Sequence, residues 1–420
     1  MNSRTVRPVR NRNPQPTQRR GRNPYAGGRS DARGREKQRI DWSKLLIKEE
    51  QYFDYELLLS VVFLMCFGLV MLYSASAYDN GMYLFVKQAL IGVVSFVGML
   101  AVSKFDYHIF GAYSYAIYVI SIILMALVRF TPLGVEAKGA KRWLGIPGTD
   151  FQIQPSEIAK IAVILFISYE ICRLGKKLNT KEGLIRVAGF GVIAAGSVFF
   201  LTDNLSTAII VAGITFILIF VAHPKTKPFV KFMIGVLIVA GVVVLIAMAT
   251  ASEDSNFRIG RIVTWLDPEG SSSDEGYQVM QGLYAIGSGG FWGKGLGKST
   301  QKLGVIPESQ NDMILTIICE ELGVFGVIVL LLLFGLLLYR LMFIAQNAPD
   351  LYGSLVATGI FAHIALQVVL NIAVVTNMIP TTGITLPFIS YGGTSIVFLM
   401  AEMGIALGIS RTIKLKEGTL

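Results

Sequence analysis

The chain contains ten runs of mostly apolar residues that are long enough, or nearly so, to cross a lipid bilayer. A spanning helix needs about 20 such residues, and lipid offers no partner to a free backbone amide, so each run is expected to be a helix. The runs cover residues 56–78, 84–102, 110–130, 156–172, 185–202, 205–222, 232–251, 312–338, 352–376 and 391–410. Asp203 and Asn204 predict a tight turn between two of them. The sequence therefore predicts an all-α polytopic membrane protein with about ten transmembrane helices.

Charge is scarce and unevenly distributed. Only 16% of the residues are Asp, Glu, Lys or Arg, against about 25% in an average soluble protein, which excludes an ordinary soluble domain. Residues 1–50 hold 14 basic and 5 acidic residues, and the rest of the chain is nearly balanced at +1. We expect this basic segment to be a disordered tail that either fixes orientation or docks a cytoplasmic partner or anionic lipid. The charge therefore does not indicate a nucleic-acid-binding protein.

Basic residues also predict the orientation. If the tail is cytoplasmic, Lys and Arg gather in alternate loops, as the positive-inside rule requires, and an even number of spans leaves both termini in the cytoplasm. Two long connections then face outside, residues 131–155 and 252–311, the second between helices seven and eight. The expected organisation is a tail (1–50), a membrane domain (51–412) with this large extracellular loop, and a short cytoplasmic C-terminus (413–420).

Several kinds of chemistry are not supported by the sequence. The three cysteines are isolated in or beside apolar runs, and the three histidines form no metal-binding pattern with them. Neither a serine-hydrolase G-x-S-x-G elbow nor a zinc-protease H-E-x-x-H motif occurs.

The large loop begins with two arginines, Arg258 and Arg261. A guanidinium matches phosphate oxygens in a bidentate manner, so this pair is a candidate site for a lipid headgroup or a diphosphate. The alternative, a basic anchor at the membrane edge, stays open. Lys141 and Arg142, in the other outside loop, are further candidates for the same anionic group.

A glycine-rich segment follows in the same loop. Residues 276–286 predict a short surface helix with Tyr277, Gln281 and Tyr284 on one face. Residues 287–300 end like a nucleotide-binding P-loop, but Trp292 stands where that motif requires glycine, so we reject a nucleotide site. Either the loop amides bind a diphosphate, or the segment is a tight, close-packed turn.

Asp312 stands where this polar loop meets an apolar run. A carboxylate that is partly desolvated at such a boundary becomes a better base, so Asp312 is a candidate catalytic residue. The alternative is that it caps the helix. Glu320 and Glu321 lie about two turns deeper, where structural pairing is the expected role.

Two other segments carry candidate residues. Glu157 and Lys160 are three residues apart at the start of the fourth run, so they either pair with each other or line a polar cavity that reaches Asp312. Residues 379–395 contain two prolines and closely spaced glycines before the last run. Irregular backbone at this depth is tolerated only where it lines a cavity or is buried in protein.

Several long motifs in this chain resemble the SEDS family (shape, elongation, division and sporulation), the FtsW and RodA group of peptidoglycan glycosyltransferases. The resemblance covers about residues 55–412. The motifs are RWLGI and FQIQPSEIAK, then GYQVMQ, AIGSGGFWGKGLGKSTQKLGVIPESQND and EELGVFG, and finally TGITLPFISYGGTS. Residues in these motifs that are expected to shape the loops are Gln278, Gln281, Gly289, Gly290, Pro307, Glu308, Ser390, Gly392 and Gly393.

The resemblance implies a reaction. Family members polymerise lipid II, a disaccharide-pentapeptide on undecaprenyl diphosphate, into β-1,4 glycan strands with inversion at the outer membrane face. It implies that Asp312 is the general base, that Glu157 and Lys160 form the pair of the central cavity, and that Arg258 and Arg261, or a divalent cation such as Mg²⁺ or Mn²⁺, offset charge on the departing diphosphate. It also implies a class B penicillin-binding protein as partner, together with other divisome or elongasome membrane proteins.

This chain departs from the family pattern at two places. Asn311 and Met313 flank the aspartate where the usual form has Thr before it and Phe after it, which affects its fine positioning. Thr382 stands where some members carry Lys, so no role for a cation is carried over to that position.

The long basic tail and the loop sequence favour an FtsW-type enzyme at the division septum over a RodA-type enzyme of elongation. A flippase or transporter for lipid-linked precursors, without bond-making activity, is the alternative of another class. The boundary position of Asp312 favours the enzyme, because transporters place their key groups near the midplane.

Overall fold

The computed structural model describes residues 46–47, 52–76, 81–137, 140–145, 152–250, 257–270, 274–302, 306 and 309–414. For residues 81, 137, 243, 246–250, 257–260 and 274–275 only the backbone is described. Nearly all of the predicted tail (1–50) and the end of the predicted C-terminal segment (413–420) lie outside the described residues.

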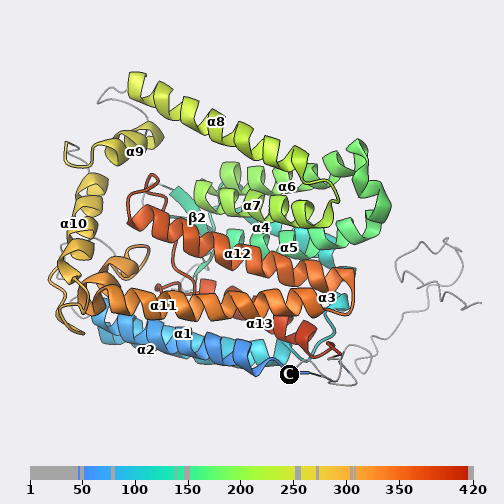
Figure 1. Ribbon diagram of the computed structural model, residues 1–420, viewed down its shortest axis with the longest axis horizontal. Coiled ribbons are helices and arrows are strands. Elements are labelled where there is room, and N and C mark those ends of the chain that lie inside the picture. Colours follow the sequence, from blue (N-terminus) through green and yellow to red (C-terminus); the bar gives the residue numbers. More distant parts are fainter. Residues whose placement is uncertain are drawn as a thin grey trace, which may run out of the picture. The chain divides into compact units, whose positions relative to one another are not determined.

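The described chain is mostly helical, and each apolar run of the sequence coincides with a helix (Figure 1). The helices are α1 (Tyr55–Ala75), α2 (Gly81–Val102), α3 (His108–Ala112), α4 (Ser114–Phe130), α5 (Pro155–Leu174), α6 (Lys181–Thr202), α7 (Leu205–Ala222), α8 (Lys227–Thr250), α9 (Phe257–Leu266), α10 (Asp274–Gly289), α11 (Ile314–Asn347), α12 (Leu351–Val375) and α13 (Ser395–Ser410), and a 3-10 turn, Gly175–Asn179, follows α5. Among the described residues, six helices are long and apolar enough to cross a membrane: α1, α2, α6, α7, α11 and α12. The count of ten spans remains a prediction.

Polar side chains at the helix starts explain where several helices begin. Asp54 caps α1, accepting from Leu57 N at 2.8 Å, and Asp350 caps α12 through Gly353 N at 2.7 Å. Asn204 caps α7 through Thr207 N at 3.0 Å, directly after Asp203, whose φ of 48° is left-handed. The tight turn predicted at these two residues is therefore present.

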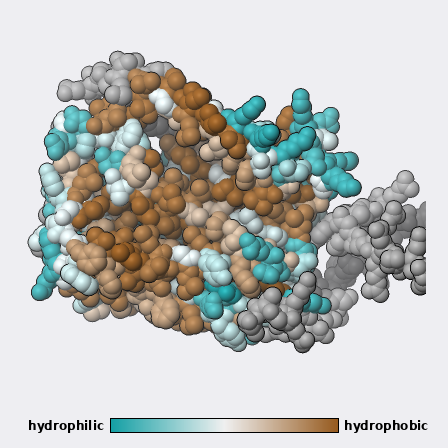
Figure 2. All heavy atoms as spheres, viewed as in Figure 1, coloured by the Kyte–Doolittle hydropathy of each residue, from teal (hydrophilic) through white to brown (hydrophobic). Residues whose placement is uncertain are grey.

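The helices pack side by side. α11 packs between α1 and α12, α12 also contacts α5 and α7, and α13 packs on α2. We call the end of the helices that bears α9 and α10 the loop end, and the end that bears α3 and the C-terminus of α13 the tail end (Figure 1). In Figure 2 apolar side chains cover the flank of the helices and polar side chains gather toward the two ends, as expected where lipid surrounds the flank.

A small antiparallel sheet was not predicted. Its strands β1 (Gly134–Ala137), β2 (Ala140–Gly145) and β3 (Gln152–Ile153) are hydrogen-bonded in that order at the loop end. The segment was predicted only as a long outside connection, because the strands are short and lack the alternation of apolar and polar residues that marks a strand in sequence. The all-α prediction is therefore correct for the helices and incomplete here.

The helix α11 is broken near its start. Gly323 has φ 65° and ψ −163°, so residues 314–322 and 324–347 form two helical segments joined at a kink. A Cβ at this position would lie 2.4 Å from the amide nitrogen of Gly293, so only glycine fits here. The kink brings the glycine-rich loop after α10 against the first segment of α11.

Candidate functional site

Asp312 lies half-buried at the loop end, two residues before α11 begins. Its carbonyl oxygen accepts from Nδ2 of Asn371 on α12 at 2.9 Å, and the same nitrogen donates to the carbonyl of Ile384 at 2.6 Å. A Cβ on Gly383 would lie 3.7 Å from Oδ2 of Asp312, so the 379–395 segment passes beside the carboxylate. The N-cap position of α11 is Met313, one residue beyond Asp312.

Glu157 and Lys160, in the first turns of α5, form a buried ion pair of 3.0 Å. Glu157 also accepts from Ser395 Oγ at 2.8 Å, and Lys160 Nζ donates to Oε1 of Gln367 on α12 at 3.2 Å. Gln367 in turn donates to the carbonyl of Thr385 at 3.0 Å. The two residues therefore pair with each other, and hydrogen bonds through Gln367 connect the pair to the segment beside Asp312. A polar cavity between them and Asp312 remains a prediction.

Glu320 and Glu321 hold the glycine-rich loop. Glu321 is paired with Lys302 at 2.7 Å and accepts from Ser74 of α1 at 2.6 Å. Glu320 is paired with Lys294 at 2.6 Å. Both side chains are fully buried, and the hydrogen bonds described here join them to α1 and to this loop. Structural pairing, the role expected for them, accounts for these contacts.

The amides of the glycine-rich loop donate to the same two carboxylates. The donors to Glu321 are Gly297 N at 3.0 Å and Ser299 N at 3.2 Å. The donors to Glu320 are Thr300 N at 3.1 Å and Gln301 N at 3.3 Å. These backbone amides already donate to carboxylates, so they do not point to a bound diphosphate. The hydrogen bonds favour a close-packed turn over a phosphate-binding loop.

Arginines lie at the loop end on α4, β2 and α9. Arg142 of β2 donates to the carbonyl of Asp203 at 3.4 Å, and Arg129 pairs with the Asp203 carboxylate at 3.1 Å. Burial, and then the positive charge of nearby Arg261, lower the pKa of the Arg142 guanidinium, so two cations lie near each other at the loop end. Lys141 lies opposite Glu136 of β1 in the sheet. The Arg258 backbone lies in α9, and its side chain is outside the described part.

Thr382 lies in the backbone segment beside the aspartate and is bound to the start of α7. Ser206, in the first turn of α7, donates to the carbonyl of Thr382, and α7 directly follows the Asp203 carbonyl that Arg142 contacts. The next residue, Gly383, lies beside the Asp312 carboxylate. The carboxylate therefore borders the backbone at Gly383, and Arg142 contacts the turn before α7, the helix to which this backbone is bound.

The other predicted loop residues have structural positions. A Cβ on Gly289 would lie 1.9 Å from the carbonyl oxygen of Cys319, so this glycine allows α10 to pack on α11, and Gly290 continues with φ 57°. Ser390 Oγ accepts from Leu386 N at 2.8 Å, and Gly392 O accepts from Ser395 N at 2.9 Å, just before Gly393 turns with φ 48°. Gln278 and Gln281 are half-buried on α10, whereas Pro307 and Glu308 lie outside the described residues.

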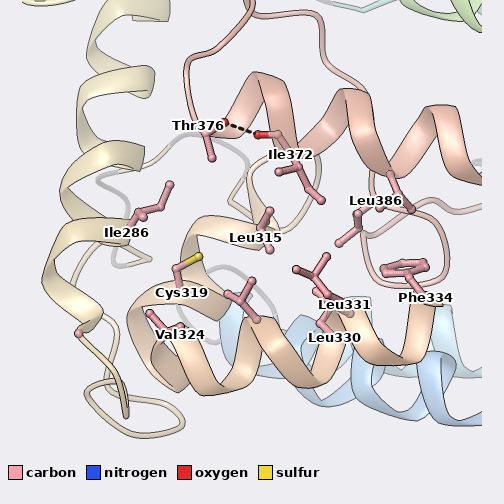
Figure 3. Close-up of a pocket in the computed structure, with 13 residues that line it drawn as sticks. Ile286, Leu315, Cys319, Val324, Leu330, Leu331, Phe334, Ile372, Thr376 and Leu386 are labelled. Carbon is pink, nitrogen blue, oxygen red and sulfur yellow. Dashed lines mark hydrogen bonds between the residues drawn. The ribbon is translucent and has the colours of Figure 1, made fainter. Parts of the chain in front are cut away.

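An apolar cavity of about 240 Å³ lies between both segments of α11 and α12 (Figure 3). The side chains of Ile286, Leu315, Cys319 and Ile372 are among those around it, contributed by α10, α11 and α12. Leu315 is three residues beyond Asp312, so the cavity lies close to the aspartate along the chain. Its lining suits hydrocarbon rather than sugar or phosphate.

Among the residues described, no group of three or more His, Cys, Asp or Glu side chains comes together as a metal site would require. The described residues at Asp312 therefore do not themselves supply the ligand set for the divalent cation that the sequence left open.

Sequence analysis missed four buried residues: Asn371, Gln367, His363 and Glu402. The first three repeat every four residues along α12, on one face of a helix that is otherwise mostly apolar. That spacing was a readable signal, because polar side chains at membrane depth are costly and tend to be functional.

The chain was compared with known proteins. Residues 55–415 match the family model described as cell cycle protein, which covers FtsW, RodA and SpoVE. The chain is 37% identical to stage V sporulation protein E of Bacillus subtilis (strain 168), over 85% of this chain and 97% of that protein. It is 36% identical to the probable peptidoglycan glycosyltransferase FtsW of Trichlorobacter lovleyi, over 86% and 94% of the two chains.

Solved structures agree with this fold. One is a chain from a study of how polymerization and crosslinking are coordinated by a peptidoglycan synthase complex, with a TM-score of 0.70, 25% identity, and 87% and 99% of the two chains covered. Another is the rod shape determining protein RodA of Thermus thermophilus, with a TM-score of 0.61, 25% identity, and 87% and 98% covered.

Proposed function

Because this chain belongs to the cell cycle protein family of FtsW, RodA and SpoVE, we propose that it is a peptidoglycan glycosyltransferase that polymerises lipid II. The observation that carries the proposal is the half-buried Asp312 at the loop end, whose main-chain carbonyl is held by Asn371 and whose carboxylate lies beside Gly383. The backbone there is bound to the start of α7, and Arg142 contacts the turn that leads into the same helix. The reaction needs a base and a partner for a departing anion, and this arrangement offers both.

In the proposed reaction, the 4-hydroxyl of the acceptor sugar attacks the anomeric carbon of the growing strand. Asp312 takes the proton of that hydroxyl as the new C–O bond forms. The bond between the anomeric carbon and the lipid diphosphate breaks, and the diphosphate leaves with the electron pair. Attack from the face opposite the leaving group gives a β-1,4 link with inversion. A half-buried carboxylate suits this role, because incomplete solvation favours accepting a proton.

The cations of the site have the complementary role. Burial lowers the pKa of the Arg142 guanidinium most and the positive charge of Arg261 lowers it further, so an anion beside these two groups would offset their repulsion. A diphosphate carries such charge and accepts bidentate hydrogen bonds from guanidinium groups. We assign them to the leaving diphosphate. The apolar cavity beside α11 suits the hydrocarbon part of a lipid-linked substrate.

We propose that the loop end faces outside the cytoplasmic membrane. Exposed basic residues at the tail end, such as Lys176 and Lys177 after α5, support this orientation through the positive-inside rule. A class B penicillin-binding protein is the proposed partner, which agrees with the similarity to a synthase complex that joins polymerization and crosslinking.

The proposed cellular role is septal wall synthesis. Several FtsW proteins are among the relatives, and the basic tail supports the same choice. An elongation role of the RodA type uses the same chemistry and is the alternative. A fluorescently tagged copy in the native bacterium separates them: enrichment at the septum supports division, and an even distribution along the lateral wall contradicts it.

The proposed activity is tested with the full chain and its class B partner in proteoliposomes that contain lipid II. We expect glycan strands of many disaccharide units, with β-linkages when the product is analysed by NMR and by muramidase digestion. Movement of lipid II between leaflets without any polymer would instead support a flippase and contradict the proposal.

A further inference from the structure

A stripe of polar side chains runs along α12. His363, Gln367 and Asn371 are spaced four residues apart, so they lie on one face of the helix. Their exposed fractions are 1%, 3% and 0%, and Glu402 of α13, beside His363, is 1% exposed. The stripe therefore begins near the middle of α12 and ends beside Asp312.

The hydrogen bonds fix the orientation of each group along the stripe. Gln367 donates through Nε2 to the carbonyl of Thr385, so its Oε1 must face the other way. That oxygen is 2.8 Å from His363 Nε2 and 3.2 Å from Lys160 Nζ. An amide oxygen only accepts, so His363 carries a proton on Nε2.

The remaining ring nitrogen of His363 shares one proton with Glu402. Nδ1 lies 2.7 Å from Glu402 Oε2. Either an imidazolium donates to a carboxylate, or a protonated carboxyl donates to a neutral imidazole, and the pair has no net charge in both cases. Because Lys160 is paired with Glu157, the whole connected set is neutral, which lowers the cost of burying it.

The stripe holds the backbone around the aspartate at three carbonyl groups. Gln367 binds the carbonyl of Thr385, and Asn371 binds those of Ile384 and Asp312. Gln367 also contacts the Lys160 ammonium. A change at His363 therefore reaches both Lys160 and the segment beside Asp312 through Gln367.

A purely structural role does not explain why these groups are ionisable. Replacing a buried ion pair by apolar side chains of similar volume is often neutral or stabilising, and a membrane makes the polar choice more costly. We propose that His363 and Glu402 are positioning residues, which orient Gln367 and through it fix Lys160 and the 382–391 backbone for turnover at Asp312. The expected effect on turnover rests on the proposed function, whereas the expected effect on the backbone does not.

The kinetic test compares two single variants, His363→Gln and Glu402→Gln, with the double variant His363→Leu/Glu402→Leu. The double variant leaves no orphaned buried partner, so its melting temperature should be close to wild type. We expect all three to polymerise lipid II with kcat about 10-fold lower and KM within about 2-fold, because misplacing catalytic groups slows turnover. If the double variant has wild-type kcat, the inference is wrong.

A matched control is the buried pair of Asp54 and Arg340 at the tail end, 2.8 Å apart. Asp54→Asn should lower the melting temperature while kcat stays within about 2-fold of wild type. A similar loss of kcat in this variant would show that any buried pair affects turnover, and would contradict a specific role for His363 and Glu402.

A second readout does not depend on catalysis. Amide hydrogen exchange of residues 382–391 should be faster in the double variant than in wild type, because the Gln367 contact to Thr385 is loosened. Unchanged exchange would overturn the inference even if the protein polymerises lipid II. Absence of polymer from wild type would contradict the proposed function, and the exchange result would still test the positioning role.

Discussion

Asn371 joins the backbone at Asp312 to the segment that passes beside it. Its side-chain nitrogen binds two carbonyl groups, those of Asp312 and Ile384, and it is fully buried. Two stretches of chain that are far apart in sequence are thereby joined at one amide group. The residue has no obvious chemical role of its own, and its importance follows from those two contacts.

We predict that Asn371→Leu, which is similar in volume, lowers kcat for lipid II at least about 10-fold and destabilises the protein by about 1–3 kcal/mol. The loss follows because two buried carbonyl groups lose their donor. Steady-state kinetics and thermal melting measure the two effects. Asn347→Leu, the same substitution at the exposed end of α11 away from the site, is the control and should change neither.

A second residue-scale prediction concerns pH. At the tail end, hydrogen bonds that His108 donates to Asp106 first and Asp350 second raise the pKa of His108 to about 9, and the distances are 2.6 and 2.7 Å. A raised histidine pKa stabilises the fold fully below the unfolded value of about 6.5 and loses that effect as the pH rises through 9.

The melting temperature of wild type should therefore fall between pH 6.5 and 9.5 by more than that of His108→Gln, which cannot titrate. Scans of both proteins across this range measure the difference. Parallel curves for the two would mean that the cluster does not stabilise the fold. The same cluster also responds to acid. Hydrogen bonds from His108 contribute to lowering the pKa of Asp350 to about 2, below its ordinary value of 3.8. The ionised carboxylate therefore stabilises the fold above about pH 4 and loses this effect as the pH falls toward 2.

At the scale of elements, the close packing of α10 on α11 depends on Gly289. A Cβ there would lie 1.9 Å from the Cys319 carbonyl, which is backbone and cannot move aside. Gly289→Ala should therefore lower the melting temperature and the yield of folded protein. Gly287→Ala on the same helix meets nothing within 4 Å and should be neutral or slightly stabilising, because alanine favours helix. Equal melting temperatures for the two variants would contradict the packing described here.

The elements that the sequence predicted are those set by local pattern. The apolar runs became helices, and the turn at Asp203 and Asn204 is present, because both depend on neighbouring residues. The kink at Gly323 and the stripe on α12 depend on partners distant in sequence, such as Lys160 with Gln367, 207 positions apart. The sheet joins strands that are close in sequence, but these are too short to carry a strand pattern. Asp312 could be recognised as a boundary carboxylate, whereas the donor that holds it, 59 positions away, could not.

At the scale of the whole molecule, the proposed chemistry lies at the loop end, and exposed basic residues such as Lys176 and Lys177 lie at the tail end. Basic residues prefer the cytoplasmic side of a membrane, where anionic lipids attract them, so this distribution favours an orientation with the loop end outside. Two exposed lysines lie at opposite ends and can report it: Lys298 in the glycine-rich loop and Lys177 after α5.

We predict that, with the native cysteines replaced, Lys298→Cys reacts with a membrane-impermeant maleimide in intact cells. Lys177→Cys should react only after the membrane is permeabilised. Thermal melting of each variant checks that the fold is retained. The reverse labelling pattern would invert the orientation and contradict a site on the outer face.

The central claim is that Asp312 is the base that activates the acceptor hydroxyl of lipid II. The most direct measurement compares wild type, Asp312→Asn and Asp267→Asn in the polymerisation assay with the partner present. Asp267 is an exposed carboxylate of the same loop, so the same substitution there controls for lost charge. We predict glycan strands from wild type and Asp267→Asn, and at least about 100-fold less product from Asp312→Asn at an unchanged melting temperature. Wild-type polymerisation by Asp312→Asn would contradict the account.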